Sequence, residues 1–422
     1  MKSHYQVVVV GGGTGGIMTA AQLKRRDRRL SIAIVEPSET HSYQPAWTLV
    51  GAGVFDFRKT RRPESSLIPR GVDWIRDRVT DFHPERNSVT TAASGDITYE
   101  ALVVAAGIQN DTDALPGLRE ALQRENVCSN YLDPQKTFEV LKRFKGGNAL
   151  FTQPATPIRC GGAPQKIMYL AEEYFTKSGV REKTQIVFAT PGTVIFGTPE
   201  FAEELNRIIR RKRIRFKPFY KPVRIDPDRQ EVTFLVTKPD TVLLEADMDG
   251  DVGERLIEAN TVSIRYDMLH LAPPQSAPDF IKRSPFAHRD GPNKGWMNVD
   301  IHTLKNPDFQ NVFGLGDSAA LPTAKTGAAI RKQVPVVVEN VLRTLKQMSV
   351  SEEKTYEGYS SCPIVTGYGK MLLCEFEYGN VRSSDPFLSR FVNTAKEQWS
   401  MWLLKKYGLP WLYWNMMMKG RM

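Results

Sequence analysis

Two short stretches of the chain carry residues whose types and spacing could do redox chemistry. The first reads P-I-R-C-G-G-A-P-Q-K and places Cys160 before a pair of glycines, between Arg159 and Lys166. A cysteine thiolate is a nucleophile, and neighbouring cations or a helix N-terminus lower its pKa. A helix is expected to begin near Pro164. Because these surroundings are polar and glycine-rich, we interpret Cys160 as a reactive thiol and not as a small core residue.

The second stretch, Q-V-V-V-V-G-G-G-T-G-G, lies near the N-terminus and places a G-x-G-x-x-G pattern at Gly11, Gly13 and Gly16. A buried strand precedes the glycines, an apolar helix follows them, and a second strand ends at Glu36. The glycines allow a tight turn and a close approach of the backbone to a pyrophosphate, and Glu36 can bind the ribose hydroxyls. The pattern predicts a dinucleotide site, of FAD or of NAD.

Two later segments bear on the choice between these cofactors. Residues 99–107, Y-E-A-L-V-V-A-A-G, predict a strand that ends in small residues at Gly107. Residues 312–319, V-F-G-L-G-D-S-A, predict another strand, and a helix is expected from about Gly327. In this order the segments resemble the flavoproteins with two dinucleotide-binding domains. That resemblance implies FAD in the first site, with Asp317 bonding its ribityl or pyrophosphate group.

The second domain lacks the glycine loop that its position in the chain leads one to expect. A predicted strand, Asn148–Thr152, runs into a loop that contains Pro154 and Pro157. Proline has a fixed φ and no N–H, so this loop cannot wrap a pyrophosphate in backbone donors. The domain still reads as α/β, with a strand at residues 185–189 and a helix at residues 199–212. We expect it not to bind NAD(P)H, so another electron donor must reduce the flavin.

The composition limits the number of domains and the kinds of partner and cofactor that the chain could have. The 422 residues suffice for two or three domains, and Lys and Arg exceed Asp and Glu by 10, which favours an anionic partner such as a lipid surface. The four cysteines include no C-x-x-C pair, and no Cys/His cluster has zinc spacing, so no metal is expected. The strand that begins at the N-terminus leaves no room for a signal peptide, and no apolar run predicts a spanning helix.

Several long blocks then resemble one family, the sulfide:quinone oxidoreductases of the mitochondrial type. They are C-G-G-A-P-Q-K-I-M-Y-L from residue 160, Y-Q-P-A-W-T-L-V-G-A-G from residue 43, the S-C-P-I-V-T-G-Y-G-K block around Cys362, L-P-T-A-K-T-G-A-A from residue 321, and P-W-L-Y-W-N-M-M-M-K-G from residue 410. Together they extend over essentially the whole chain.

The resemblance implies a fold and a reaction. The fold is α/β, with two tandem Rossmann-like domains of the disulfide-reductase type and a C-terminal amphipathic, membrane-associating region. Cys160 and Cys362 are implied to meet beside the flavin, joined by a disulfide or a trisulfide. Hydrosulfide attacks, Cys362 keeps the persulfide, and Cys160 leaves as a thiolate that adds to flavin C4a. A small acceptor (glutathione, sulfite or a second sulfide) takes the sulfane sulfur, and reduced FAD passes its electrons to a quinone.

The resemblance also implies the domain limits and the cofactor contacts. Residues 1–110 and 291–350 would form the FAD domain, residues 111–290 the second domain, and residues 351–422 the C-terminal region. The implied FAD contacts are Gly11, Gly13, Thr14, Gly15, Gly16, Glu36, Gln44, Val79, Gly107, Asp317 and Gly327, with Lys332 as a cation for the reduced flavin. Cys128 and Cys374 stand outside the family blocks, and Cys374 is expected in the core.

The tail W-S-M-W-L-L-K-K-Y-G-L-P-W-L-Y-W-N-M-M-M-K-G, residues 399–420, predicts how the chain meets a lipid surface. Gly408 and Pro410 are expected to break it into two short amphipathic pieces. Its aromatic residues (Trp399, Trp402, Tyr407, Trp411, Tyr413, Trp414) suit the headgroup boundary, and its basic residues (Lys405, Lys406, Lys419, Arg421) suit anionic lipid. A core helix or a dimer interface is the alternative. Phe376, Tyr378 and Tyr413 are candidates for stacking on a quinone.

We therefore expect a peripheral (monotopic) protein of the cytoplasmic face of a bacterial inner membrane, or of the mitochondrial inner membrane if the chain is processed. It could form a homo-oligomer. A type 2 NADH:quinone dehydrogenase is the nearest alternative, but it needs a second glycine loop and no cysteines. A flavocytochrome sulfide dehydrogenase would be exported, and a redox-inert flavin-binding sensor would have no use for the cysteine pair. The basic run at residues 210–215 is too short to indicate nucleic-acid binding.

Overall fold

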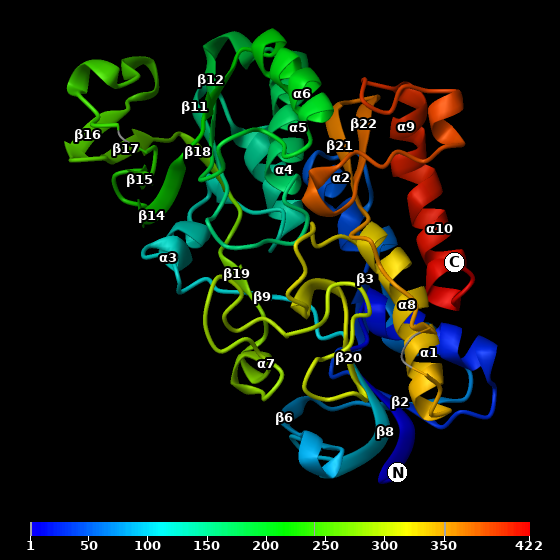
Figure 1. Cartoon of the computed structure of the whole chain (residues 1–422). Helices are drawn as coiled ribbons and strands as arrows, with labels where there is room; N and C mark the ends of the chain where they lie inside the picture. The colour runs from blue at the N-terminus through cyan, green and yellow to red at the C-terminus, as the bar shows by residue number, and fades with distance from the viewer. Residues whose placement is uncertain (1, 240, 350–351) are drawn as a thin grey trace.

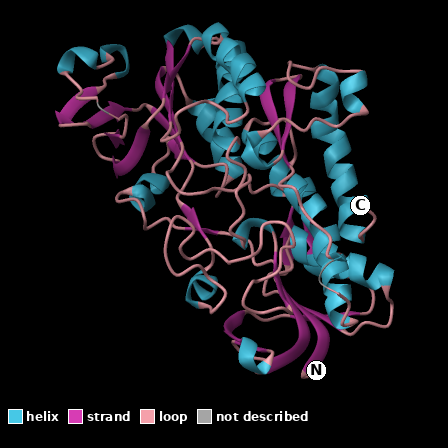
Figure 2. Cartoon of the chain, viewed as in Figure 1, coloured by secondary structure: helices cyan, strands magenta, loops and turns pink. Residues whose placement is uncertain are grey.

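The computed structural model describes residues 2–239, 241–349 and 352–422. Figure 1 shows the N-terminal sheet at the lower end of the view, a second sheet at the upper left, and the C-terminal helices along the right-hand side. Figure 2 shows that helices flank both sheets, which is the α/β arrangement expected from the sequence. The predicted domain limit at residues 350/351 lies outside the described residues.

The first sheet carries the N-terminal nucleotide loop. Within the described residues its strands run in the order β5-β2-β1-β8-β7-β6, with β20 on β8. The strands are β1 (His4–Val10), β2 (Ile32–Val35), β5 (Val72–Ile75), β6 (Val79–His83), β7 (Ser88–Thr91), β8 (Asp96–Val104) and β20 (Val312–Gly314). β1 pairs in parallel with β2 and with β8, so its four valines are buried on both faces. This explains why the strand reads as a continuous apolar run.

Two helices, α1 (Thr14–Arg26) and α8 (Gly327–Leu345), pack together against this sheet. Their apolar side chains share one core cluster with β1 and β2, including Ile17 and Val337. The predicted strand at residues 312–319 is shorter than expected, because β20 ends at Gly314. Gly316, at φ +72°, turns the chain into a single 3₁₀ turn that holds Asp317.

The second unit has its own parallel sheet, in the order β10-β18-β11-β12-β13. The strands are β10 (Val127–Cys128), β11 (Gly147–Thr152), β12 (Thr184–Ala189), β13 (Ile214–Lys217) and β18 (Met268–Leu271). The helices of this region are α3 (Leu118–Gln123), α4 (Pro134–Arg143), α5 (Ala163–Lys177) and α6 (Pro199–Arg211). The predicted strands at residues 148–152 and 185–189 and the predicted helix at residues 199–212 are thus confirmed.

Smaller elements complete the fold. An antiparallel sheet extends the second unit, with β14 (Tyr220–Asp226), β15 (Glu231–Val236), β16 (Arg255–Glu258) and β17 (Thr261–Arg265). Three two-stranded pairs are β3 (Thr40–Ser42) with β4 (Arg61–Pro63), β9 (Gln109–Asn110) with β19 (Gln275–Ser276), and β21 (Ser360–Gly367) with β22 (Lys370–Phe376). Short helices are α2 (Trp47–Gly51) and α7 (Asp279–Arg283).

The C-terminal tail corrects one expectation. Gly408 and Pro410 do not break it, because α9 (Trp399–Leu403) continues through a π-helical turn, Leu404–Gly408, into α10 (Leu409–Asn415). Proline cannot donate to the helical ladder and its ring crowds the preceding turn, and the wider π turn takes up this misfit. No helix among the described residues is long and apolar enough to cross a bilayer.

Candidate active site

The loop between β11 and α5 brings Cys160 against Cys362 on β21. The two sulfur atoms are 3.7 Å apart, and neither forms a disulfide. A Cβ atom at Gly162 would lie 2.6 Å from the Cys362 sulfur, so only glycine at this position lets the strand approach the loop this closely. Two residues 202 positions apart in sequence therefore form one thiol pair.

Lys166, one turn into α5, supplies the charge at this pair. Its Nζ donates to the Cys160 sulfur at 3.0 Å, and its side chain is 2 % exposed. The hydrogen bond from Cys362 and the charge of Lys166 outweigh burial and hold the pKa of Cys160 well below its ordinary value. The same hydrogen bond, together with burial, raises the pKa of Cys362. The geometry therefore favours Cys160 as the thiolate and Cys362 as the protonated partner.

The other cation expected at the thiol lies elsewhere. Arg159 directs its guanidinium away from the sulfur, with Nε donating to Asp317 at 2.6 Å and Nη1 to Gln44. Arg159 forms a β-bridge with Lys325, and Cys160 next to it has a left-handed backbone conformation, so the two side chains point in different directions. Adjacency in sequence thus does not place this cation at the thiol.

Lys405, from the π turn of the tail, approaches the thiol pair instead. The sequence assigned it to anionic lipid, but it is 4 % exposed and its Nζ donates to the Pro45 carbonyl at 2.8 Å. Burial, with the charge of Lys166 nearby, lowers the pKa of Lys405 to about 7. This correction follows from the helix register, which turns Lys405 inward and leaves the next residue, Lys406, partly exposed.

The backbone of Cys160 is held in a strained conformation. Its φ of +52° lies in the left-handed region, which non-glycine residues rarely occupy. Its N–H donates to the Lys325 carbonyl at 2.8 Å, and its carbonyl accepts from the Ala163 N–H at 2.7 Å and from the Tyr131 hydroxyl at 3.2 Å. Burial raises the pKa of Tyr131, so its hydroxyl stays protonated and remains a donor. These contacts fix the direction of the sulfur atom.

The nucleotide loop has the geometry that a pyrophosphate requires. Gly11 has φ +103°, and a Cβ at Gly16 would lie 1.8 Å from the Gly11 carbonyl oxygen, so both positions demand glycine. A Cβ at Gly13 would meet nothing within 4 Å, and no side chain caps the first N–H groups of α1. Glu36 lies beside the loop and accepts from the Gly12 N–H at 2.7 Å. The loop, with Thr14 and Gly15 opening α1, fits the pyrophosphate of a dinucleotide.

The remaining predicted FAD contacts lie in two places. Gln44 and Asp317 are joined through Arg159, and a Cβ at Gly107 would lie 3.6 Å from the same guanidinium. Val79 lies apart from them as the first residue of β6, where its side chain is buried in the core. The structure therefore gathers Gln44, Gly107 and Asp317 around one point between the glycine loop and the thiol pair.

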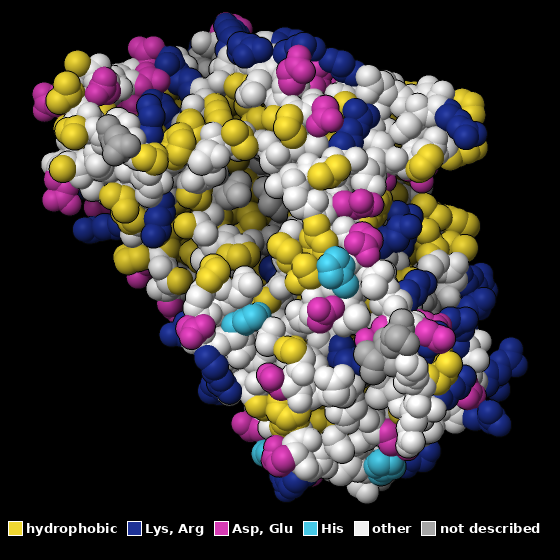
Figure 3. Space-filling model, viewed as in Figure 1, with side chains coloured by type: hydrophobic (Ala, Val, Ile, Leu, Met, Phe, Trp, Pro, Cys, Tyr) yellow, Lys and Arg dark blue, Asp and Glu magenta, His cyan; other side chains and the backbone are white. Residues whose placement is uncertain are grey.

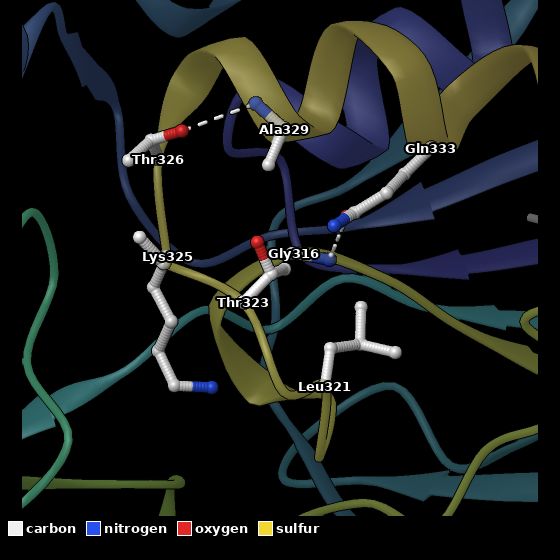
Figure 4. A pocket seen from close by; sticks show the side chains of 8 residues that line it. Gly316, Leu321, Thr323, Lys325, Thr326, Ala329 and Gln333 are labelled. Atoms are coloured by element: carbon white, nitrogen blue, oxygen red, sulfur yellow. Dashed lines mark hydrogen bonds between the residues drawn. The ribbon is translucent and has the colours of Figure 1, made fainter. Parts of the chain in front are cut away.

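A small pocket at the start of α8 adds a cation that sequence reasoning missed. Figure 4 shows it lined by Gly316, Thr323, Lys325 and Gln333, and the Gly316 N–H donates to Gln333 at 2.8 Å. Lys325 donates to the carbonyl groups of Asp317 and Ala319, and burial lowers its pKa to about 8.

The two residues that the sequence placed at this helix, Gly327 and Lys332, do not line the pocket. A Cβ at Gly327 would meet nothing within 4 Å, whereas Lys332 is exposed, with its ammonium 5.5 Å from the centre of the Tyr359 ring. Lys325 is thus the lysine that lines this pocket.

The three quinone candidates lie in different clusters. Phe376 packs edge-on against Phe196 in the core of the second unit. The Tyr378 hydroxyl donates to the Ile301 carbonyl at 2.6 Å, and its ring packs against Tyr356. Tyr413 lies at the nucleotide loop, with its hydroxyl 2.7 Å from Thr14 Oγ1. The structure does not bring the three rings to one site.

The tail aromatics divide between the core and the surface. Trp402, Tyr413 and Trp414 are buried, contrary to the expected place at the headgroup boundary, whereas Trp399 and Trp411 are 66 % and 59 % exposed. Figure 3 shows hydrophobic and basic side chains side by side along the edge where these helices lie. The alternative of a core helix is therefore right for one face of the tail, and the outer face exposes tryptophan rings to solvent.

Comparisons with known proteins show the family of the chain. Residues 5–249 match the model of the pyridine nucleotide-disulphide oxidoreductase family. The mitochondrial sulfide:quinone oxidoreductase of Mus musculus is 42% identical over 99% of this chain and 87% of its own length. That of Dictyostelium discoideum is 38% identical over 100% of this chain and 87% of its own length. The chain belongs to the sulfide:quinone oxidoreductase family.

A solved structure supports the fold. The sulfide:quinone oxidoreductase of Aquifex aeolicus superposes with a TM-score of 0.78 over 99% of this chain and 92% of that chain, at 20% identity. The family resemblance drawn from the sequence blocks and the predicted α/β fold are thus confirmed. The roles of the individual site residues stay predictions, and Tyr131, Lys325 and Lys405 join them from the structure alone.

Proposed function

We propose that this chain oxidises sulfide through Cys160 and Cys362 and passes the two electrons to a membrane quinone. The observation that carries the proposal is the pair of sulfur atoms 3.7 Å apart, with the Lys166 ammonium 3.0 Å from one of them. The choice of sulfide as substrate and quinone as electron acceptor follows the names of the mitochondrial sulfide:quinone oxidoreductases that are 42% and 38% identical to this chain.

The thiol chemistry follows from the two pKa directions. In the resting enzyme the cysteines are joined directly or through one extra sulfur. In the directly joined pair, hydrosulfide attacks the Cys362 sulfur and the bond to the Cys160 sulfur breaks. Cys362 keeps a persulfide, and Cys160 leaves as a thiolate paired with Lys166.

The cofactor we propose is FAD. The residues that would hold it are the loop Gly11–Gly16, Glu36, Gln44 and Asp317. When bound, FAD accepts two electrons from the thiol site and releases them to a quinone. Arg159 and Lys325 orient the Asp317 segment and add positive charge at that end of the site.

Several finer assignments extend this proposal. A small nucleophile (glutathione, sulfite or a second sulfide) takes the sulfane sulfur from Cys362. The exposed face of α9 and α10, with Trp399 and Trp411, rests on the membrane in which the quinone is dissolved. The relatives in mouse and Dictyostelium discoideum are mitochondrial, which supports a peripheral place at a respiratory membrane. The FAD domain is formed by residues 1–110 and 291–350, and the second domain by residues 111–290.

The test is anaerobic spectroscopy of the purified holoenzyme with sulfide and, separately, with NADH. Sulfide should bleach the flavin and NADH should not, and a quinone should restore the colour. Bleaching by NADH alone would instead identify a type 2 NADH:quinone dehydrogenase.

Two serine variants assign the reaction to the thiol pair. A Cys160→Ser variant should bind FAD yet resist reduction by sulfide. Cys128→Ser is the matched control, because Cys128 is fully buried and burial raises the pKa of its thiol. Normal turnover of Cys160→Ser would remove Cys160 from the mechanism.

A further inference from the structure

The C-terminal helix reaches the nucleotide loop through one side chain. The Tyr413 hydroxyl lies 2.7 Å from Thr14 Oγ1 and 2.6 Å from His41 Nε2, and Tyr413 is 3 % exposed. Thr14 is the first residue of α1, so it stands where the helix N-terminus meets the pyrophosphate site. A residue near the end of the chain therefore bonds directly to the loop that would hold FAD.

Two more buried polar groups continue this contact around the loop. His41 Nδ1 lies 3.2 Å from the Gly12 carbonyl oxygen and 3.3 Å from Glu64 Oε2. Glu64 is 2 % exposed, and burial raises its pKa. Its Oε1 has no hydrogen-bond partner among the described residues, and a Cβ at Gly12 would lie 2.5 Å from that atom. An unpartnered buried oxygen thus faces the loop, next to the carboxylate of Glu36.

The tail around Tyr413 is packed tightly enough to transmit a change at the loop. Its ring centre lies 4.5 Å from that of Tyr43 and 4.9 Å from that of Trp414. The Arg62 guanidinium stacks over Trp414 at 4.3 Å. Further along, a Cβ at Gly420 would lie 2.8 Å from the backbone of α1. Residues 409–422 therefore pack on the same helix that opens the nucleotide site.

We propose that Tyr413 and His41 belong to the cofactor-binding structure, so that FAD binding at the glycine loop and docking of residues 409–422 stabilise each other. The coupling must act in both directions, since a ligand that favours the docked tail is itself favoured by it. This inference goes beyond the proposed function, because it concerns retention of the cofactor and holds whatever reduces it. It also links the membrane-facing helix to the redox centre.

The size of the effect follows from the contacts. Tyr413→Phe keeps the ring and removes only the hydroxyl, which leaves His41 and Thr14 without this partner. One to two hydrogen bonds of about 1 kcal/mol each set an upper limit of about 5- to 30-fold on the change in FAD affinity, because only the part that differs between the FAD-bound and FAD-free protein affects binding. We expect FAD to leave the Tyr413→Phe holoenzyme about tenfold faster than the wild type.

The experiment measures FAD release from diluted holoenzyme by the rise in flavin fluorescence, without any sulfide. Tyr220→Phe is the matched control, because Tyr220 is also buried and its hydroxyl donates to Glu254 at 2.7 Å in a sheet of the second unit. We expect this control to release FAD at the wild-type rate. Equal release rates in the two variants would overturn the proposal.

A second measurement needs no variant and stands even if Tyr413→Phe does not fold. Hydrogen exchange of residues 409–422 in wild-type holoenzyme should slow when excess free FAD is added and quicken when FAD is diluted away. Peptides of β14 and β15 should not respond. Exchange of residues 409–422 that is independent of FAD would show that the tail and the cofactor site are uncoupled. Because neither measurement involves sulfide or quinone, failure here leaves the proposed function untouched.

Discussion

Replacing Lys166 with glutamine isolates the electrostatic part of the thiol site. The ammonium lies 3.0 Å from the Cys160 sulfur, and two unit charges at that distance attract by about 5 kcal/mol at an effective dielectric constant of about 20. Burial disfavours the charged form of Lys166 and offsets part of this attraction. Replacing the lysine should therefore remove about 1.5 to 3 kcal/mol of thiolate stabilisation, the amount typical of a hydrogen bond to a charged group. That loss corresponds to a drop of about 10- to 100-fold in the acid dissociation constant of the Cys160 thiol.

Alkylation by iodoacetamide after mild reduction measures this directly, because the thiolate is the reacting species. The rate at Cys160, followed by mass spectrometry between pH 5 and 9, should fall in Lys166→Gln, and its pH midpoint should rise. Lys24→Gln is the control, since that ammonium also donates to two carbonyl groups but lies at the far end of α1. An unchanged midpoint in Lys166→Gln would refute the assignment of Lys166 as the charge that holds Cys160 ionised.

Three further outcomes follow from the site. Tyr131→Phe should slow alkylation of the active-site cysteine several-fold, because its strained backbone loses a hydrogen bond, whereas Tyr220→Phe should not. Burial lowers the pKa of Lys405 to about 7 from 10.5, so the unfolded chain binds more protons between these values and wild-type stability rises across that range. Melting curves should therefore show Lys405→Met most favoured over wild type below pH 7, with an advantage that shrinks toward pH 10; parallel curves would contradict this. Serine at both Trp399 and Trp411 should weaken sedimentation with anionic vesicles while leaving the melting temperature nearly unchanged, because both rings are exposed.

The sequence predicts those parts of the site that depend on local pattern. The nucleotide loop could be predicted because the positive φ of Gly11 and the contact of Gly16 with the Gly11 carbonyl oxygen arise within a single strand, turn and helix. Cys160 could be predicted as a reactive thiol because its neighbours in sequence are charged residues, glycines and proline, which are not typical of a hydrophobic core. The pairing with Cys362 came only from family resemblance, since no local rule links a loop to a strand 202 residues away.

The tail shows what sequence patterns leave undetermined. Lys405 and Lys406 are adjacent and chemically alike, yet only the first is buried. Which of them turns inward depends on the π turn between Leu404 and Gly408, and this turn exists because Pro410 must be fitted into a continuous helix. Arg159 likewise has the right charge beside the right cysteine, but the β-bridge to Lys325 sends its guanidinium to Asp317.

The same tail also resolves two readings that looked exclusive. An amphipathic aromatic helix can be a core element or a membrane element, and here one face is buried in the core while the other exposes its tryptophan rings. Lys405 and Tyr413 are eight residues apart, a rise of about 12 Å along a helix, and they reach the Pro45 carbonyl beside Gln44 and the Thr14 hydroxyl at the glycine loop. Trp399 and Trp411 take part in neither contact and remain exposed. The buried face of this helix therefore contacts both ends of the proposed cofactor site, so its docking bears on the thiol pair and on the nucleotide loop together, while the exposed face is the one that we propose rests on lipid.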